Sequence, residues 1–157
     1  MRRRIAHHRR RRPTHWRTLE PPNDPVTAMT RLNAATSGVI LDCLTMYVSG
    51  LLVRGDSDAR IVQKIRRLCA AIRGASFPVI VVTNEVGSGI VPESPLGRRF
   101  RDLAGLANQI AAESADHVVL MVAGIPLWIK GHDVTASMSG IEANSLHRDS
   151  RSRGRKT

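Results

Sequence analysis

The sequence has few cysteines, few aromatic residues and no long apolar run. Its two cysteines, Cys43 and Cys69, both lie in apolar segments, where a thiol usually behaves as a small buried hydrophobe. No C-x-x-C pair and no Cys/His spacing typical of zinc occurs, which argues against a disulfide framework and a structural zinc site. No apolar run reaches the roughly 18–20 residues of a membrane span, so we expect no transmembrane helix. The basic N-terminus also lacks the apolar stretch of a secretion signal, which predicts a cytoplasmic protein.

Acidic residues are absent where basic residues are densest. The net charge of the 157 residues is +11, and residues 1–17 contribute eight arginines and no acidic residue. From residue 18 to residue 131 the chain holds eleven basic and ten acidic residues, so this part is close to neutral. A basic arm that binds nucleic acid is one interpretation of residues 2–17. Only five aromatic residues occur in the chain, and Trp16 alone is near the arm, which leaves no visible stacking platform.

Three short apolar runs rich in β-branched residues predict strands that are buried on both faces. They are GVILDCL at 38–44, PVIVVTN at 78–84 and HVVLMVAG at 117–124. Helical patterns lie between them and ahead of them, at 24–36, 58–74 and 94–114. Alternating helices and strands indicate an α/β domain with a mostly parallel sheet, because parallel neighbours need a crossover connection that helices supply. We place this domain at residues 1–131 and expect the basic, Ser-rich tail at 132–157 to be disordered.

The two longer helices have recognisable start and stop signals. In the segment 58–74, Asp58 is a plausible cap and Gly74 a stop, and the expected buried stripe is Ile61, Ile65, Leu68 and Ile72. In the segment 94–114, Ser94 caps the start and Pro95 suits the first turn. The stripe expected to be buried there is Leu96, Phe100, Leu103, Ala107 and Ile110.

Polar residues follow the predicted strands. The first strand leads to Asp42, Cys43 and Thr45, the second to Thr83, Asn84 and Glu85, and the third to Gly124. In open parallel sheets, ligands bind outside the carboxyl ends of the strands. Carboxylate and hydroxyl oxygens at this edge suit a Mg-nucleotide, although an Asp at a strand end is about as often a structural cap. A P-loop of the form G-x-x-x-x-G-K-[ST] occurs nowhere in the 157 residues.

The arginine-rich stretch RRRIAHHRRRRPTHW at 2–16 is also compatible with nucleotide chemistry. A histidine that attacks a nucleotide phosphorus must be neutral, and neighbouring cations lower its pKa and so favour that form. Arginines also bind triphosphate oxygens in a bidentate manner. Composition alone leaves the catalytic histidine and the solvated basic arm as open alternatives, and the arm is the commoner of the two.

Three stretches together resemble one enzyme family. RIAHHRRRRPTHWRTLE at 4–20, VILDCLTMYVSGLL at 39–52 and the run from VVTNEVGSGIVPE to IPLWIKG at 81–131 are similar to the bifunctional adenosylcobinamide kinase/adenosylcobinamide-phosphate guanylyltransferases of cobalamin biosynthesis. The resemblance implies a three-layer α/β fold of P-loop NTPase type. It also implies phosphorylation of adenosylcobinamide by a nucleoside triphosphate, then transfer of GMP from GTP to adenosylcobinamide phosphate through a guanylyl-histidine.

The resemblance also assigns roles to residues. The family pattern R-I-x-x-H-R makes His8 the nucleophile and leaves His7 and His15 unmatched. The residues implied to bind GTP are Arg9, Arg10, Arg11, Arg12, Glu20 and Asp42, with Asn84 and Glu85 as secondary candidates. No protein-bound metal is implied, GTP or ATP with Mg²⁺ is the expected nucleotide, and a homo-oligomer that binds no nucleic acid is the expected assembly.

The sequence departs from the family pattern at its start. Family members begin with a strand and a Gly-rich P-loop, whereas this sequence begins near the R-I-x-x-H-R helix. We therefore expect an N-terminally truncated version of the fold that lacks the phosphate cradle of the kinase step. An interior strand left without its neighbour also predicts low stability. Besides the transferase, a small nucleic-acid-binding protein and an inactive remnant remain as alternatives.

Overall fold

The computed structural model describes residues 13, 15–19, 24–32 and 35–131. His8, Arg9, Arg10, Arg11, Arg12, Glu20 and the tail 132–157 lie outside these residues. The elements, in chain order, are α2 (Pro25–Met29), β1 (Val39–Asp42), α3 (Leu44–Val53), α4 (Asp58–Arg73), β2 (Val79–Val82), α5 (Pro95–Ser114), β3 (Val118–Val122) and β4 (Ile125–Lys130). This is the mixed α/β class that the sequence predicts.

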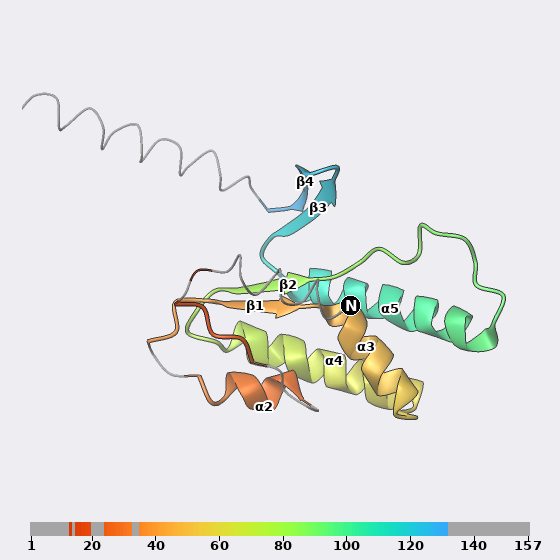
Figure 1. Ribbon diagram of the computed structural model, residues 1–157, viewed down its shortest axis with the longest axis horizontal. Coiled ribbons are helices and arrows are strands. Elements are labelled where there is room, and N and C mark those ends of the chain that lie inside the picture. Colours follow the sequence, from red (N-terminus) through yellow and green to blue (C-terminus); the bar gives the residue numbers. More distant parts are fainter. Residues whose placement is uncertain (1–12, 14, 20–23, 33–34, 132–157) are drawn as a thin grey trace, which may run out of the picture.

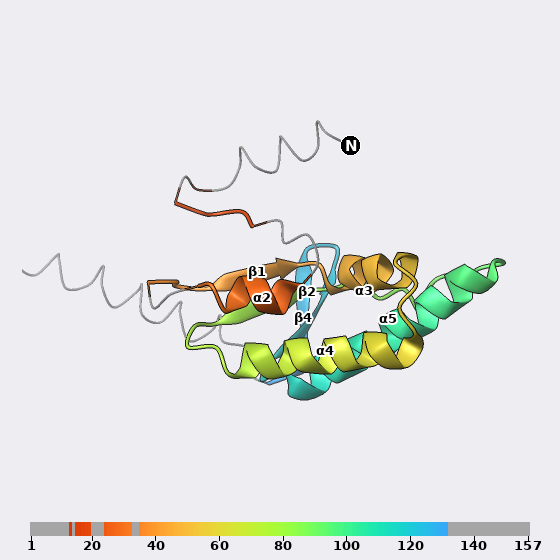
Figure 2. The same ribbon diagram turned by 90° about the horizontal axis from the view of Figure 1, so that it is seen from below.

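Strands β1 and β2 form a small parallel sheet, with Val39 opposite Val79 and Asp42 opposite Val82. The predicted burial of both faces is wrong for these strands, because burial alternates along each of them. One face packs against the hydrophobic core through Leu41, Val79 and Val81. The other face carries the exposed side chains Ile40, Ile80 and Val82. In the part of the chain that the structure describes, the helices cover one face of this sheet only (Figures 1 and 2).

The core lies where α3, α4 and α5 pack together. Its most deeply buried side chains are Leu44, Val48, Leu51, Ile61, Ile65 and Leu68. Figure 2 shows α4 and α5 running side by side along the molecule, and α3 packs against both. Apolar residues at steps of four and three give α4 a single buried face, with Ile61, Ile65 and Leu68 buried as predicted and Ile72 only partly buried. Its cap differs from the prediction, because the Ser57 side chain accepts the Arg60 N–H and Asp58 is the first helical residue.

Helix α5 begins as predicted, with Ser94 accepting the Gly97 N–H and Pro95 in the first turn. Leu103, Ala107 and Ile110 are buried, and Phe100 packs at the margin of the core. Leu96 is exposed, contrary to prediction, because the first turn of α5 extends past the helices on which the rest of the stripe packs.

Helix α3 was not predicted, because its sequence LTMYVSGLLV has apolar residues on most sides and therefore no clear period. Cys43 is its N-cap residue and Leu44 its first residue, so the expected strand over 38–44 ends at Asp42. Conversely, the helix expected over 24–36 is limited to the five residues of α2, where the Asp24 side chain caps the start.

The third predicted strand does not join the parallel sheet. β3 pairs antiparallel with β4, which was not predicted, and the two form a separate hairpin. Ala123 and Gly124 connect them with positive φ values of 51° and 83°, the geometry of a two-residue hairpin turn. Gly124 therefore lies in this turn and not at the edge shared by β1 and β2. The short local connection explains the outcome, since an antiparallel partner follows immediately in the sequence.

The hairpin is tied to the end of α5. Lys130 donates from Nζ to the carbonyl oxygens of Ala112 and Glu113, both at 3.0 Å, near the negative end of the helix dipole. Most apolar side chains of β3 and β4 are exposed. No helix among the described residues is long and apolar enough to cross a membrane.

Candidate functional site

The carboxyl ends of β1 and β2 meet in a hydrogen-bonded network. The hydroxyl oxygens of Thr45 and Thr83 lie 3.1 Å apart, and the Asn84 N–H donates to Thr45 Oγ1 at 2.9 Å. Thr83 in turn donates to Asn108 Oδ1 at 2.6 Å, so the Thr45 hydroxyl is left to donate to Thr83. Thr45, which is buried in the first turn of α3, thus joins the two strand ends as the strand-end rule predicted.

A side chain from α5 completes the network. Asn108 Nδ2 donates to the Asn84 carbonyl oxygen at 3.1 Å and to Glu85 Oε1 at 2.8 Å. With the bond from Thr83, one amide contacts three consecutive residues of the segment that leaves β2. Sequence reasoning missed Asn108. Its one signal is a polar amide directly after the buried Ala107.

The structure brings together the predicted site residues that it describes. Asp42 is exposed at the last position of β1, and Asn84 and Glu85 follow the neighbouring strand. Cys43 is half-buried with a free thiol, and its Sγ lies 4.0 Å from Asn84 Nδ2. Cys69 is buried and free, as expected. The roles of His8, Arg9 to Arg12 and Glu20 stay predictions, because these residues lie outside the described ranges.

The donor set at this edge contains two carboxylates, one at the end of each strand. Across residues 13, 15–19, 24–32 and 35–131, no group of three His, Cys, Asp or Glu side chains could hold a metal ion. Asp42 and Glu85 supply one carboxylate from each strand end, whereas the buried Thr45 hydroxyl is already paired with Asn84 and Thr83. Mg²⁺ is commonly bound by one or two carboxylates together with substrate phosphates and water. Asp42 and Glu85 are oxygen donors of the type that such an ion uses.

The segment between β2 and α5 is fastened to α5 at its far end as well. Arg101 Nη2 donates to the Gly87 carbonyl oxygen at 2.7 Å. Arg98 Nη1 donates to the carbonyl oxygens of Pro92 and Glu93. Between these anchors, a turn closed by the bond from Gly89 N–H to Val86 O at 3.3 Å leads to Ile90.

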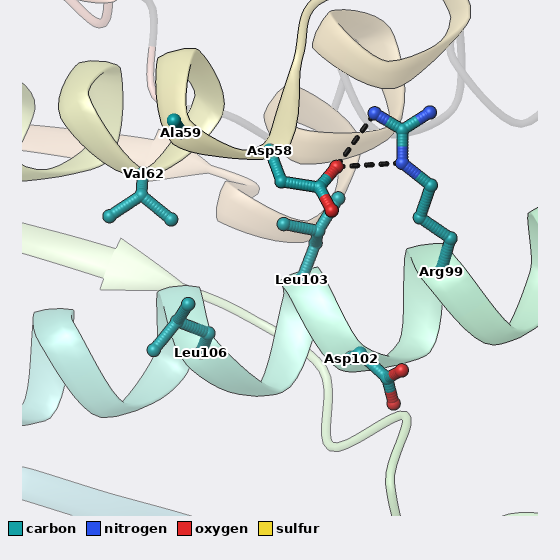
Figure 3. A pocket seen from close by; sticks show the side chains of 7 residues that line it. All are labelled: Asp58, Ala59, Val62, Arg99, Asp102, Leu103 and Leu106. Carbon is teal, nitrogen blue, oxygen red and sulfur yellow. Dashed lines mark hydrogen bonds and ion pairs between the residues drawn. The ribbon is translucent and has the colours of Figure 1, made fainter.

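A cavity of about 420 Å³ lies elsewhere, between α4 and α5 (Figure 3). Its lining consists of Asp58, Ala59, Val62, Arg99, Asp102, Leu103 and Leu106. Arg99 on α5 donates from Nε to Asp58 Oδ1 on α4 at 2.7 Å, which joins the two helices at this cavity. The lining residues are mostly apolar or already paired, so this cavity offers less chemistry than the sheet edge.

Asp56 anchors the start of α4 beside that cavity. Its carboxylate accepts from Lys64 Nζ at 2.7 Å and faces Arg60 Nε at 3.4 Å. The hydrogen bond from Lys64 is the main reason why the pKa of Asp56 lies below its ordinary value. Arg99 Nη2 also donates to the Asp56 carbonyl oxygen at 3.0 Å. These contacts stabilise the α3–α4 connection and leave the sheet edge untouched.

These features define a mixed α/β protein with a small parallel sheet whose carboxyl edge carries amide, hydroxyl and carboxylate groups. The chain belongs to the cobinamide kinase/cobinamide phosphate guanyltransferase family, whose model matches residues 1–129. This confirms the resemblance found in the sequence. The match includes both the arginine-rich stretch and the network at the ends of β1 and β2.

Curated relatives agree with the family assignment. The chain is 42% identical over 139 residues to the bifunctional adenosylcobalamin biosynthesis protein CobU of Salmonella typhimurium, covering 81% of this chain and 77% of the relative. It is 41% identical over 133 residues to CobP of Pseudomonas aeruginosa, covering 83% and 75%. It is 42% identical over 142 residues to CobU of Escherichia coli, covering 81% and 77%. All three carry the same functional description and connect the family with adenosylcobalamin biosynthesis.

Proposed function

We propose that this chain transfers GMP from GTP to adenosylcobinamide phosphate through a guanylyl group carried on His8. The observation that supports this most is the extent of the family match, since residues 1–129 include the R-I-A-H-H-R stretch as well as Thr83 to Glu85. We further propose that residues 1–131 form one nucleotide-binding domain of three-layer P-loop type, followed by a basic tail at 132–157. A cytoplasmic homo-oligomer that binds no nucleic acid is part of the same proposal.

The proposed transfer takes two steps, guanylylation of His8 and then transfer of GMP to the acceptor. A ring nitrogen of neutral His8 attacks the α-phosphorus of GTP, the bond to the bridging α–β oxygen breaks, and pyrophosphate leaves with its electron pair. A phosphate oxygen of adenosylcobinamide phosphate then attacks the same phosphorus, and the P–N bond breaks to regenerate His8. Covalent catalysis of this kind divides one difficult displacement into two easier ones.

Charged and polar residues hold the nucleotide in this proposal and keep His8 in its neutral form. Arg9 to Arg12 neutralise the triphosphate and lower the pKa of His8, which keeps the imidazole neutral for attack. In this proposal Asp42 and Glu85 hold the nucleotide from the sheet edge, Glu20 contacts it from the N-terminal segment, and Asn84 contributes its side-chain amide. Mg²⁺ bound to the triphosphate would supply Lewis-acid polarisation of the phosphates, with Asp42 and Glu85 as its protein ligands.

An assay for each half of the family's activity separates the two steps. Transfer of label from γ-labelled ATP or GTP to adenosylcobinamide reports the kinase step, and transfer of GMP from α-labelled GTP to adenosylcobinamide phosphate reports the guanylyl transfer.

Incubation with α-labelled GTP tests the covalent step. The expected result is one label per chain, held by a bond that is labile to acid and stable to alkali, as a phosphoramidate is. His8→Ala should abolish the label. The neighbouring substitution His7→Ala is the matched control and should retain it. A chain that takes up no label from GTP alone, and passes no GMP to the corrinoid phosphate, would be the inactive remnant.

A further inference from the structure

The loop from Val86 to Val91 carries the most exposed apolar side chain of the described residues. Ile90 is 96% exposed, and its neighbour Val91 is 56% exposed. Exposed apolar side chains of this size are common singly, but this pair lies on a loop whose two ends are both fastened by α5. Asn108 holds the start of the segment and Arg98 its end. The tip of the loop, Ile90 and Val91, is thus held in position by hydrogen bonds from α5 on both sides.

Two glycines in this loop are not required by the protein itself. A Cβ on Gly87 would meet nothing within 4 Å, and one on Gly89 would meet the Val86 carbonyl oxygen at an ordinary 3.6 Å. Neither glycine has a positive φ. Glycine is needed where φ is positive or where another group approaches the backbone closely. Because φ is not positive at Gly87 or Gly89, their conformation does not require glycine. These positions leave open backbone beside an apolar tip, which suits the close approach of a broad ligand.

The loop begins at the proposed nucleotide edge. Ile90 follows Glu85 by five residues, so an extended chain separates their Cα atoms by at most about 18 Å. The acceptor of the proposed reaction has matching shape and chemistry. A corrinoid is a broad, flat macrocycle with methyl groups and a rim of neutral amides, and its phosphate lies at the end of an aminopropanol arm. The aminopropanol arm therefore connects the phosphate that reacts with the apolar ring, which can bind at a separate place on the protein.

We propose that the segment from Gly87 to Val91 is the platform for the corrinoid ring of adenosylcobinamide phosphate. Ile90 and Val91 contact the apolar face of the macrocycle, and the Gly87 N–H and the Gly89 carbonyl oxygen, which the bonds from Arg101 and to Val86 do not use, pair with its amides. The aminopropanol arm then places the phosphate at the carboxyl edge of β1 and β2. This proposal rests on the proposed function, since it locates the acceptor of that reaction.

Two substitutions test the platform without disturbing the fold. Ile90→Ser removes an apolar side chain that contacts little in the free protein. Gly89→Ala adds a methyl group that would keep the corrinoid ring away from the backbone at this position. Each should weaken binding of adenosylcobinamide phosphate by roughly tenfold, as expected when most of an isoleucine side chain loses apolar contact. Calorimetry gives the Kd directly, and the KM for the corrinoid in the transfer assay should rise with it. Val53→Ser, at an apolar position 78% exposed at the end of α3, is the matched control and should change neither.

The guanylylation of His8 by GTP alone separates the two proposals. It should proceed equally in the wild type, Ile90→Ser and Gly89→Ala, because no corrinoid takes part in it. If the wild type forms no guanylyl-histidine, the proposed function fails while calorimetry still decides the platform. An unchanged Kd in both loop variants, or a wild type that binds no corrinoid, would overturn the platform.

Discussion

The side-chain amide of Asn108 lies 2.8 Å from the carboxylate of Glu85, and this pair connects α5 to the segment that leaves β2. Because the amide nitrogen donates to Oε1, the second carboxylate oxygen stays available to a ligand. The same amide accepts the Thr83 hydroxyl proton at 2.6 Å, so its orientation is determined by the network. Asn108 is therefore a positioning residue for Glu85.

Asn108→Asp should impair nucleotide use. The substitution keeps an acceptor for Thr83 but replaces the donor to Glu85 with a negative oxygen, which repels the Glu85 carboxylate. Loss of a hydrogen bond to a charged group costs about 1.5–3 kcal/mol, so kcat/KM for guanylylation should fall by roughly 10- to 100-fold. The defect should shrink at lower pH, because the two carboxylates can then share a proton.

Gln109→Asp is the matched control for that substitution. It adds the same charge one residue further along α5, at an exposed position. Guanylylation by this variant should equal that of the wild type across the pH range. Equal losses in both variants would show that charge on the helix, and not the contact with Glu85, causes the effect.

Thr45→Val should destabilise the fold. The valine has nearly the same shape, but it leaves the Asn84 N–H without its acceptor and the Thr83 oxygen without its donor. An unsatisfied buried group costs about 1–3 kcal/mol, which denaturant unfolding would measure. Thr45→Ser keeps the hydroxyl and should retain most of the stability. A similar loss in both variants would assign the effect to the methyl group and its packing.

Asp56→Asn should lower stability at neutral pH and not at low pH. The folded-state pKa of Asp56 is lowered, chiefly by the hydrogen bond from Lys64, so its contribution is complete above the unfolded value of 3.8. It is lost as pH falls through the lower folded-state pKa. Unfolding curves for wild type and variant should therefore converge below about pH 3.8. Asp58→Asn is the control, because its more exposed pair with Arg99 should contribute little at any pH.

Periodicity predicted the long helices well and the strand partners poorly. The regular apolar spacing of α4 and α5 reflects one face against one core, which a sequence shows directly. Helix α3 is apolar on most sides, so its segment has no such period. The run at 117–124 has the composition of a buried parallel strand, yet it pairs with β4 through the turn at Ala123 and Gly124. Composition indicates a strand but does not choose its partner.

The site was predictable as far as the strand-end rule reaches. Asp42, Thr45, Asn84 and Glu85 follow parallel strands, and the register of β1 and β2 brings their ends to one edge. Asn108 comes from the middle of a helix 23 residues after Glu85, so no local pattern connects the two. Its role appears only when α5 is packed against the sheet.

The α5 side chains that hold the loop between β2 and α5 bear on how the enzyme's choice of corrinoid acceptor could be changed. Arg98 and Arg101 are three residues apart on one helix, about 4.5 Å along its axis, and they hold the two sides of the same excursion of the chain, at Pro92 and at Gly87. A stiff helix keeps that spacing whatever lies between. Residues 88–91 can therefore vary in side chain, or even in number, while the hydrogen bonds from α5 on both sides of them are kept. An engineer seeking a transferase for a different macrocycle would need to randomise only this short stretch and could leave the nucleotide edge as it is.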